Sequence, residues 1–323
     1  MSTQRFTALI QILVLTFGTV IATIQPGQSH TGSPRPRGQE NNLQISFLNF
    51  IFPRRKQRTR GDRNPSRAPF DASLPYVLTP RNTALLGTEA IALQWNPVVG
   101  ASSYTVEIAG KEFTVTDTKA TFDELESLVP NYRYTIVITA DNGISSASAE
   151  PVGFARLPET ERDRVDAQVD AIKAESLSAD ETALAIALAY RDFEHSDPDW
   201  QSYALNQDAI NVLKTRIQAG TEDSRIYLLQ ADTYLRVGLP LLARRCYRVA
   251  LTRAEVAEQT ELQAESYWGL AEVAKGQAEN EDAANHFQTA QTLYEELGDL
   301  EQVEELQVQI DELRGDHRDL SPS

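Results

Sequence analysis

The chain has 323 residues, 41% hydrophobic and 24% charged, so it has room for two ordinary domains with packed cores. Its net charge of −16 is unevenly spread: residues 1–67 hold ten basic and two acidic residues, and the rest holds 20 basic and 44 acidic residues. A single cysteine, Cys246, excludes an intramolecular disulfide and therefore the small disulfide-stabilised scaffolds.

The first predicted element is an apolar segment at the N-terminus. Arg5 precedes an uncharged run from Phe6 to Ile24. A short positive start followed by an apolar run is typical of an export signal, and this run is also long enough to serve as a retained membrane anchor. We therefore expect residues 1–29 to be a signal peptide or an N-terminal anchor. The rest of the chain is then periplasmic or extracellular.

Residues 30–73 are predicted to form a basic, disordered linker, because they are rich in Pro, Gly, Ser, Asn and Arg. Aromatic residues at 47–52 precede a cationic run that is a candidate for binding an anionic membrane surface, glycan or wall polymer. The cationic candidates are Arg54, Arg55, Lys56, Arg58 and Arg60. The alternative is a solvated linker whose charges prevent aggregation. Nucleic acid is not expected as a partner, since an exported chain rarely meets it.

Residues 74–157 alternate between apolar and polar side chains, which predicts an antiparallel β-sandwich. The expected inward faces carry Ile91, Leu93 and Trp95 on one strand and Tyr104, Val106 and Ile108 on the next. A longer strand is expected to place Tyr132, Tyr134, Ile136, Ile138 and Ala140 on one face. The first strand is expected near residues 79–82.

Two motifs in this region resemble fibronectin type III domains. One is the run from Leu93 to Tyr104, in which Trp95 precedes a Pro and a Gly. The other is Leu128-x-Pro130-x-x-x-Tyr134, the spacing of a tyrosine corner. The resemblance implies an all-β, immunoglobulin-like sandwich in which Trp95 fills the core and the Tyr134 hydroxyl bonds back to the backbone. It implies no ligand.

From residue 158 to 315 the apolar spacing becomes helical, and residues 316–323 are expected to be a disordered tail. Ser178 and Glu181 are spaced as a capping box. Gly238 is expected to end one helix and Pro240 to begin the next. Residues 184–217 look like a degenerate first repeat, and 300–313 like a terminal capping helix.

A repeat with an offset of forty residues runs through this region. Its first copy is Tyr227, Ala231, Ala243, Tyr247 and Ala250, and its second is Tyr267, Ala271, Ala283, Phe287 and Ala290. With Tyr234, these positions resemble the tetratricopeptide repeat (TPR), in which small residues let paired helices approach closely. The resemblance implies a short all-α superhelix. The period of forty instead of 34 departs from the family and requires longer helices or longer loops.

Superhelices of this family typically bind a peptide or a partner helix in a groove lined by their first helices. The resemblance therefore implies a set of groove candidates, which are Gln230, Asp232, Thr233, Arg236, Glu265, Trp268, Glu272 and Lys275. For Trp268 the alternative is an aromatic side chain packed between helices.

No pattern in the sequence indicates catalysis, and we expect no enzyme activity, no cofactor and no metal site. Only His195, Asp197 and Asp199 resemble metal ligands, and they are better explained as a helix–helix turn. The combination of regions is similar to envelope proteins of Gram-negative-type bacteria, cyanobacteria among them. We therefore predict a non-catalytic envelope scaffold that binds a protein or peptide. The alternative is a tether that binds an anionic polymer or membrane through its basic segment and β-sandwich.

Overall fold

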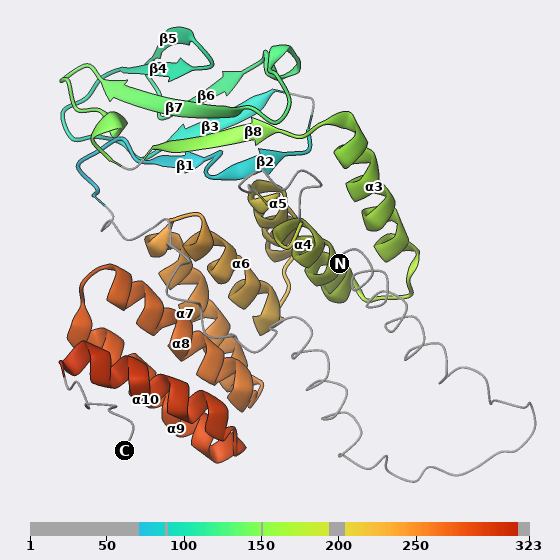
Figure 1. The fold of residues 1–323 in the computed structure, drawn as a ribbon, viewed down its shortest axis with the longest axis vertical. Helices are drawn as coiled ribbons and strands as arrows, with labels where there is room; N and C mark the ends of the chain where they lie inside the picture. The colour runs from blue at the N-terminus through green and yellow to red at the C-terminus, as the bar shows by residue number, and fades with distance from the viewer. Residues whose placement is uncertain (1–70, 88–89, 150, 194–203, 316–323) are drawn as a thin grey trace, which may run out of the picture. The chain divides into compact units, whose positions relative to one another are not determined.

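The computed structural model describes residues 71–87, 90–149, 151–193 and 204–315, all within one compact unit, Gln57–Ser323. A β-sheet region comes first and eight helices follow it in the described part of the chain (Figure 1). The predicted signal or anchor, the predicted basic linker up to residue 70, the His195 cluster and the C-terminal tail lie outside the described residues. No helix among the described residues is long and apolar enough to cross a membrane.

The strands form two sheets. The three-stranded sheet has the order β1-β3-β6, from β1 (Val77–Thr79), β3 (Ile91–Trp95) and β6 (Lys119–Phe122). The five-stranded sheet has the order β2-β8-β7-β4-β5, from β2 (Thr83–Leu85), β8 (Val152–Arg156), β7 (Arg133–Ala140), β4 (Tyr104–Ile108) and β5 (Lys111–Val115). Only β2 and β8 pair in parallel among these strands. Two short 3-10 helices, η1 (Leu125–Ser127) and η2 (Ser146–Ser148), lie in the connections.

The core of the β region takes side chains from both sheets. The predicted alternation in β3 and β4 is confirmed, because every second residue of each strand is buried. The Trp95 and Tyr104 rings meet edge to face with centroids 5.5 Å apart. The amide of Val98 donates a 2.9 Å hydrogen bond to the Tyr104 hydroxyl oxygen, so Tyr104 also holds the turn that follows Trp95.

The predicted hydrogen bond of the tyrosine corner is present, since the amide of Val129 donates to the Tyr134 hydroxyl oxygen at 2.8 Å. The prediction for Tyr132 is wrong. Strand β7 begins one residue later, at Arg133, and Tyr132 keeps 60% of its surface exposed. Its ring lies edge to face on Tyr134, with centroids 4.9 Å apart, instead of pointing into the core.

The single first strand expected near residues 79–82 is also wrong. The chain leaves one sheet after Thr79 and enters the other at Thr83. Pro80 has no amide hydrogen to donate to a strand ladder, and Asn82 has a left-handed backbone with φ of 46°. These two residues therefore turn the chain from one sheet to the other.

The helices follow one another in pairs that pack against their neighbours (Figure 1). They are α3 (Glu159–Ala174), α4 (Ala179–Arg191), α5 (Asn206–Gln218), α6 (Ser224–Arg236), α7 (Pro240–Val256), α8 (Thr260–Gly276), α9 (Asn280–Leu297) and α10 (Leu300–Arg314). The predicted capping box at Ser178 and Glu181 is present in full. Gly238, with φ of 79°, ends α6, and Pro240 is the first residue of α7, as predicted.

The small residues of the repeat are buried where helices meet. Ala231, Ala243, Ala271 and Ala283 each have no exposed surface. The turns 237–239, 257–259 and 277–279 are short, whereas α7 and α8 each have 17 residues. The long period therefore comes from longer helices and not from longer loops. The C-terminal region is a helical, repeat-like structure.

Candidate functional site

The predicted groove residues divide into a buried group and a partly exposed group. Gln230, Thr233 and Trp268 retain 4%, 0% and 3% of their surface. The Thr233 hydroxyl donates to the Leu229 carbonyl of its own helix at 2.8 Å. The Trp268 ring meets Tyr294 edge to face at 6.1 Å, within a cluster formed by α8, α9 and α10. A side chain with almost no exposed surface cannot contact a partner unless the helices rearrange, so these three residues hold the helices together.

The charged groove candidates contact neighbouring helices of the same chain. Asp232 accepts a hydrogen bond from the Tyr247 hydroxyl at 2.5 Å, and Glu265 accepts one from the Tyr294 hydroxyl at 2.7 Å. Each pair joins the first helix of a repeat to its second helix. Because each carboxylate is partly buried, its hydrogen bond also satisfies an acceptor that would be costly to leave unpaired.

The two basic candidates connect successive repeats. Arg236, at the end of α6, donates to the Arg191 carbonyl at the end of α4 over 2.6 Å. Lys275, at the end of α8, donates to Gln309 of α10 over 2.5 Å. Cations at helix C-termini are favoured by the helix dipole and by the free carbonyls there. Arg236 is exposed, and Glu272 and Lys275 are half-buried, so these three charged residues along α6 and α8 form the candidate contact face.

The residues with predicted structural roles all lie in the packing. Fully or nearly fully buried are Trp95, Tyr104, Ala231, Ala243, Tyr247, Ala271, Ala283 and Phe287, and half-buried are Tyr134, Tyr227, Tyr234 and Tyr267. Arg54, Arg55, Lys56, Arg58 and Arg60 lie outside the described residues, so their assignment to an anionic surface stays a prediction.

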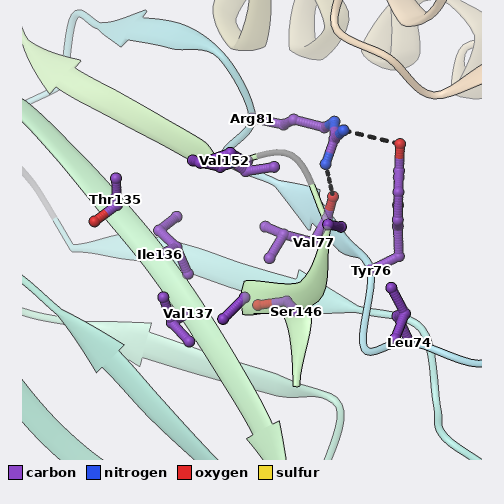
Figure 2. A pocket seen from close by; sticks show the side chains of 12 residues that line it. Leu74, Tyr76, Val77, Arg81, Thr135, Ile136, Val137, Ser146 and Val152 are labelled. Carbon is purple, nitrogen blue, oxygen red and sulfur yellow. Dashed lines mark hydrogen bonds between the residues drawn. The ribbon is translucent and has the colours of Figure 1, made fainter. Parts of the chain in front are cut away.

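A pocket of about 220 Å³ lies in the β region, beside residues 135–137 of β7 (Figure 2). Its walls are mostly apolar, with Leu74, Val77, Ile136 and Val152 among them. The volume is below the range of about 300–1,000 Å³ that ligand pockets usually have. The charged group at its rim, Arg81, is already committed to protein hydrogen bonds. We therefore regard this pocket as a gap in packing and not as a ligand site.

Arg81 and Tyr76 join the β region to the helices. The Arg81 Nε donates to the Val237 carbonyl at 2.7 Å, and the Tyr76 hydroxyl donates to the Gly238 carbonyl at 2.7 Å. The guanidinium also donates to the Tyr76 hydroxyl and to the Val77 carbonyl, as Figure 2 shows. The Arg81 guanidinium and the Tyr76 hydroxyl thus each satisfy one free carbonyl just past the C-terminus of α6. Sequence reasoning missed this junction, because its partners are 156 and 162 residues apart.

A second junction joins β2 to the N-terminus of α5. The Ala84 amide donates to the Ala204 carbonyl at 3.0 Å, and the Asn206 side chain donates to the Asn82 carbonyl at 2.9 Å. The Gln207 amide donates to the Thr83 hydroxyl at 3.0 Å. The free edge of β2 is therefore covered by chain from the helical region, which protects it from pairing with another chain. The domain boundary predicted at 157/158 stays a prediction.

Asp208, in the first turn of α5, carries the most perturbed carboxyl group of this junction. Burial raises its pKa to about 6, although the Leu86 amide donates to it at 3.5 Å. The folded state therefore holds this proton more tightly than the unfolded state, and stability should fall as pH rises from about 4 to about 6. The full shift corresponds to at most about 3 kcal/mol, and partial exposure of the side chain reduces it.

We expect Asp208→Asn to flatten this pH dependence and to stabilise the fold at pH 7. Urea unfolding between pH 4 and 7 measures the effect, with Asp163→Asn, at an exposed position of α3, as the matched control. If Asp208→Asn has the same dependence of unfolding free energy on pH as the native protein, the Asp208 carboxyl group ionises without destabilising the fold.

Burial shifts the pKa of two other reactive groups in the described part of the chain. Burial raises the pKa of the Cys246 thiol to about 12, so the thiolate that a nucleophile needs is suppressed. His286, on α9, has a pKa lowered by burial, and its ring faces Tyr267 at 6.0 Å. No group of three or more His, Cys, Asp or Glu residues among those described could hold a metal ion.

Comparison with known proteins adds little to this geometry. No protein-family model matches the chain, and no curated protein matches it significantly. Among solved structures, the crystal structure of MamA protein is similar at 18% identity and a TM-score of 0.31. That match covers 51% of this chain and 92% of the MamA chain. A TM-score this low assigns neither fold nor function.

Proposed function

We propose that the protein is a non-catalytic scaffold that binds a protein or peptide along its helical region. The observation that carries the proposal is the repeated helix pair, with alanines at one offset buried between helices. A stack of such pairs presents its first helices as one extended face, which suits a peptide or a helix better than a small molecule. We propose that this stack is TPR-like, and that the contact face is the partly exposed charged one along α6 and α8.

We propose further that the β region is a fibronectin type III-like, immunoglobulin-like sandwich that acts as a spacer. Its two sheets, the buried Trp95 and the hydrogen bond to the Tyr134 hydroxyl support this assignment. The apolar segment 6–24 supports an exported protein of the bacterial envelope, periplasmic or extracellular, with its N-terminus either cleaved or retained as an anchor.

Partner capture tests this function directly. The full chain, tagged at its C-terminus, is used as bait in detergent-solubilised envelope, and retained proteins are identified by mass spectrometry. We expect Glu272→Arg, together with Lys275→Glu, to lower capture of a defined partner by at least about a hundredfold, because charge reversal in a contact places like charges together and typically costs several kcal/mol. Lys214→Glu, an exposed charge reversal on α5, is the matched control. Full capture by the folded variant would contradict the proposed contact face.

The charge difference between the two parts of the chain favours a second candidate function, that of a tether. In that case residues 45–67 bind an anionic membrane or polymer, and the helices only stack. Deleting 45–67 from the bait should then abolish retention, and salt should release the retained material as lipid or polymer. Retention of one protein by the deleted bait excludes the tether.

A further inference from the structure

Helix α7 carries an exposed stripe that mixes apolar and cationic side chains. Leu241, Val249 and Val256 keep 42%, 39% and 80% of their surface exposed. Arg245 and Arg248 are exposed between them. The spacings of three, four and seven or eight residues place all five side chains on one face of the helix.

The two arginines of this stripe differ from the other arginines of α7. Arg244 pairs with Glu279, and Arg253 pairs with Glu222. Neither Arg245 nor Arg248 forms an ion pair within the part of the chain that the structure describes. Arginines without an acidic partner stand out here, because acidic residues outnumber basic ones by 44 to 20 in residues 68–323. The stripe is therefore suited to an anionic partner that also offers apolar side chains.

The outer face of α10 offers that combination. Leu300 and Val308 keep 69% and 52% of their surface exposed. Glu304 lies midway between them and is exposed as well. The three residues are spaced by four, so they share one face. Apolar and charged positions alternate on this face as they do on α7, with the opposite charge.

We propose that the α10 face of one copy docks on the α7 stripe of a second copy. Leu300 and Val308 would cover the apolar side chains of α7, and Glu304 would meet Arg245 and Arg248. The segment 1–67 is a poor candidate to bind this stripe, because its ten basic and two acidic residues give it a positive charge that the same arginines repel. Because α7 and α10 are different surfaces, the contact is heterologous, and repeated use of it builds rings or open chains of copies.

Directed disulfide formation tests the pairing between copies. Two forms of the full chain, both Cys246→Ser and purified in mild detergent, carry Val249→Cys in one and Val308→Cys in the other. We expect the mixture to form a disulfide-linked pair about tenfold faster than a mixture in which Val99→Cys replaces Val308→Cys, because docking raises the effective concentration. Val99 lies in the β region and is 95% exposed, so its thiol is at least as accessible.

A charge swap tests the electrostatic part of the contact. Arg245→Glu with Arg248→Glu should slow cross-linking by about tenfold and should be rescued when the second copy carries Glu304→Arg. Lys214→Glu should have no effect. Equal cross-linking at Val99→Cys, or no rescue by Glu304→Arg, overturns the proposal. Circular dichroism of each variant confirms folding, and partner capture along α6 and α8 is measured separately, so either proposal can fail alone.

Discussion

Trp95→Ala should lower the free energy of unfolding by about 3–5 kcal/mol, as removal of a large buried aromatic side chain usually does. Trp95 keeps 1% of its surface, at the centre of the β region, and its ring packs edge to face on Tyr104. The lost contacts lie on both sheets, so neither sheet can relax alone to fill the cavity. Urea unfolding followed by circular dichroism measures the loss.

Trp95→Phe is the informative control for this prediction. The indole Nε1 of Trp95 is buried without a hydrogen-bond partner in the described structure. Phenylalanine removes that unsatisfied donor and leaves a smaller cavity, so its cost should be well below that of alanine. Equal losses in the two variants would show that the aromatic ring at this position contributes no packing beyond that of alanine, and would contradict the prediction.

Gly269→Ala is expected to destabilise the helical region by at least about 1–3 kcal/mol, the usual cost of overpacking. A Cβ at Gly269 would lie 2.2 Å from Cε1 of Tyr247. That ring has no exposed surface, and its hydroxyl is held by Asp232, so it cannot swing aside. The clash outweighs the roughly 1 kcal/mol by which alanine is the better helix former. Thermal unfolding with α-helical circular dichroism measures the effect.

Two further variants isolate the clash at Gly269. Gly276→Ala, on the same helix, meets nothing within 4 Å and should be neutral or stabilising. Tyr247→Leu removes the ring, so adding Gly269→Ala to it should cost less than adding Gly269→Ala to the native chain. Additive losses in the double variant would contradict the close approach of α7 and α8 as the cause.

This close approach also matters for the proposed scaffold. Gly269 and the buried alanines set how near α7 comes to α8, and thereby how the exposed residues of α8 are spaced from those of α6. A peptide that contacts several first helices at once depends on that spacing. We therefore expect Gly269→Ala to weaken partner capture even at temperatures where the protein remains folded.

Sequence reasoning succeeded where the signal was local. Alternation in β3 and β4, the capping box at Ser178 and the turn at Gly238 each depend on residues a few positions apart. It failed for Tyr132 because one residue decides whether a side chain lies inside a strand or before it. It failed at residues 79–82 because alternation alone does not say when a chain changes sheets.

The groove candidates show the same limit. Helical spacing placed Gln230, Thr233 and Trp268 on the first helices, but it could not tell an exposed face from one covered by the next helix. Trp268 is buried by Tyr294, which is 26 positions away, and Arg236 is occupied by α4, 45 positions away. Nothing in the local sequence encodes those distances.

The sequence by itself determined the order of the regions, the periodicity of each and the sites of their caps and turns, because these follow from backbone preferences over a few residues. Only the tertiary structure decided which helix faces remain open and how the β region meets the helices through Tyr76 and Arg81. Those contacts join residues 156 and 162 positions apart, and each becomes favourable only after both partners have folded.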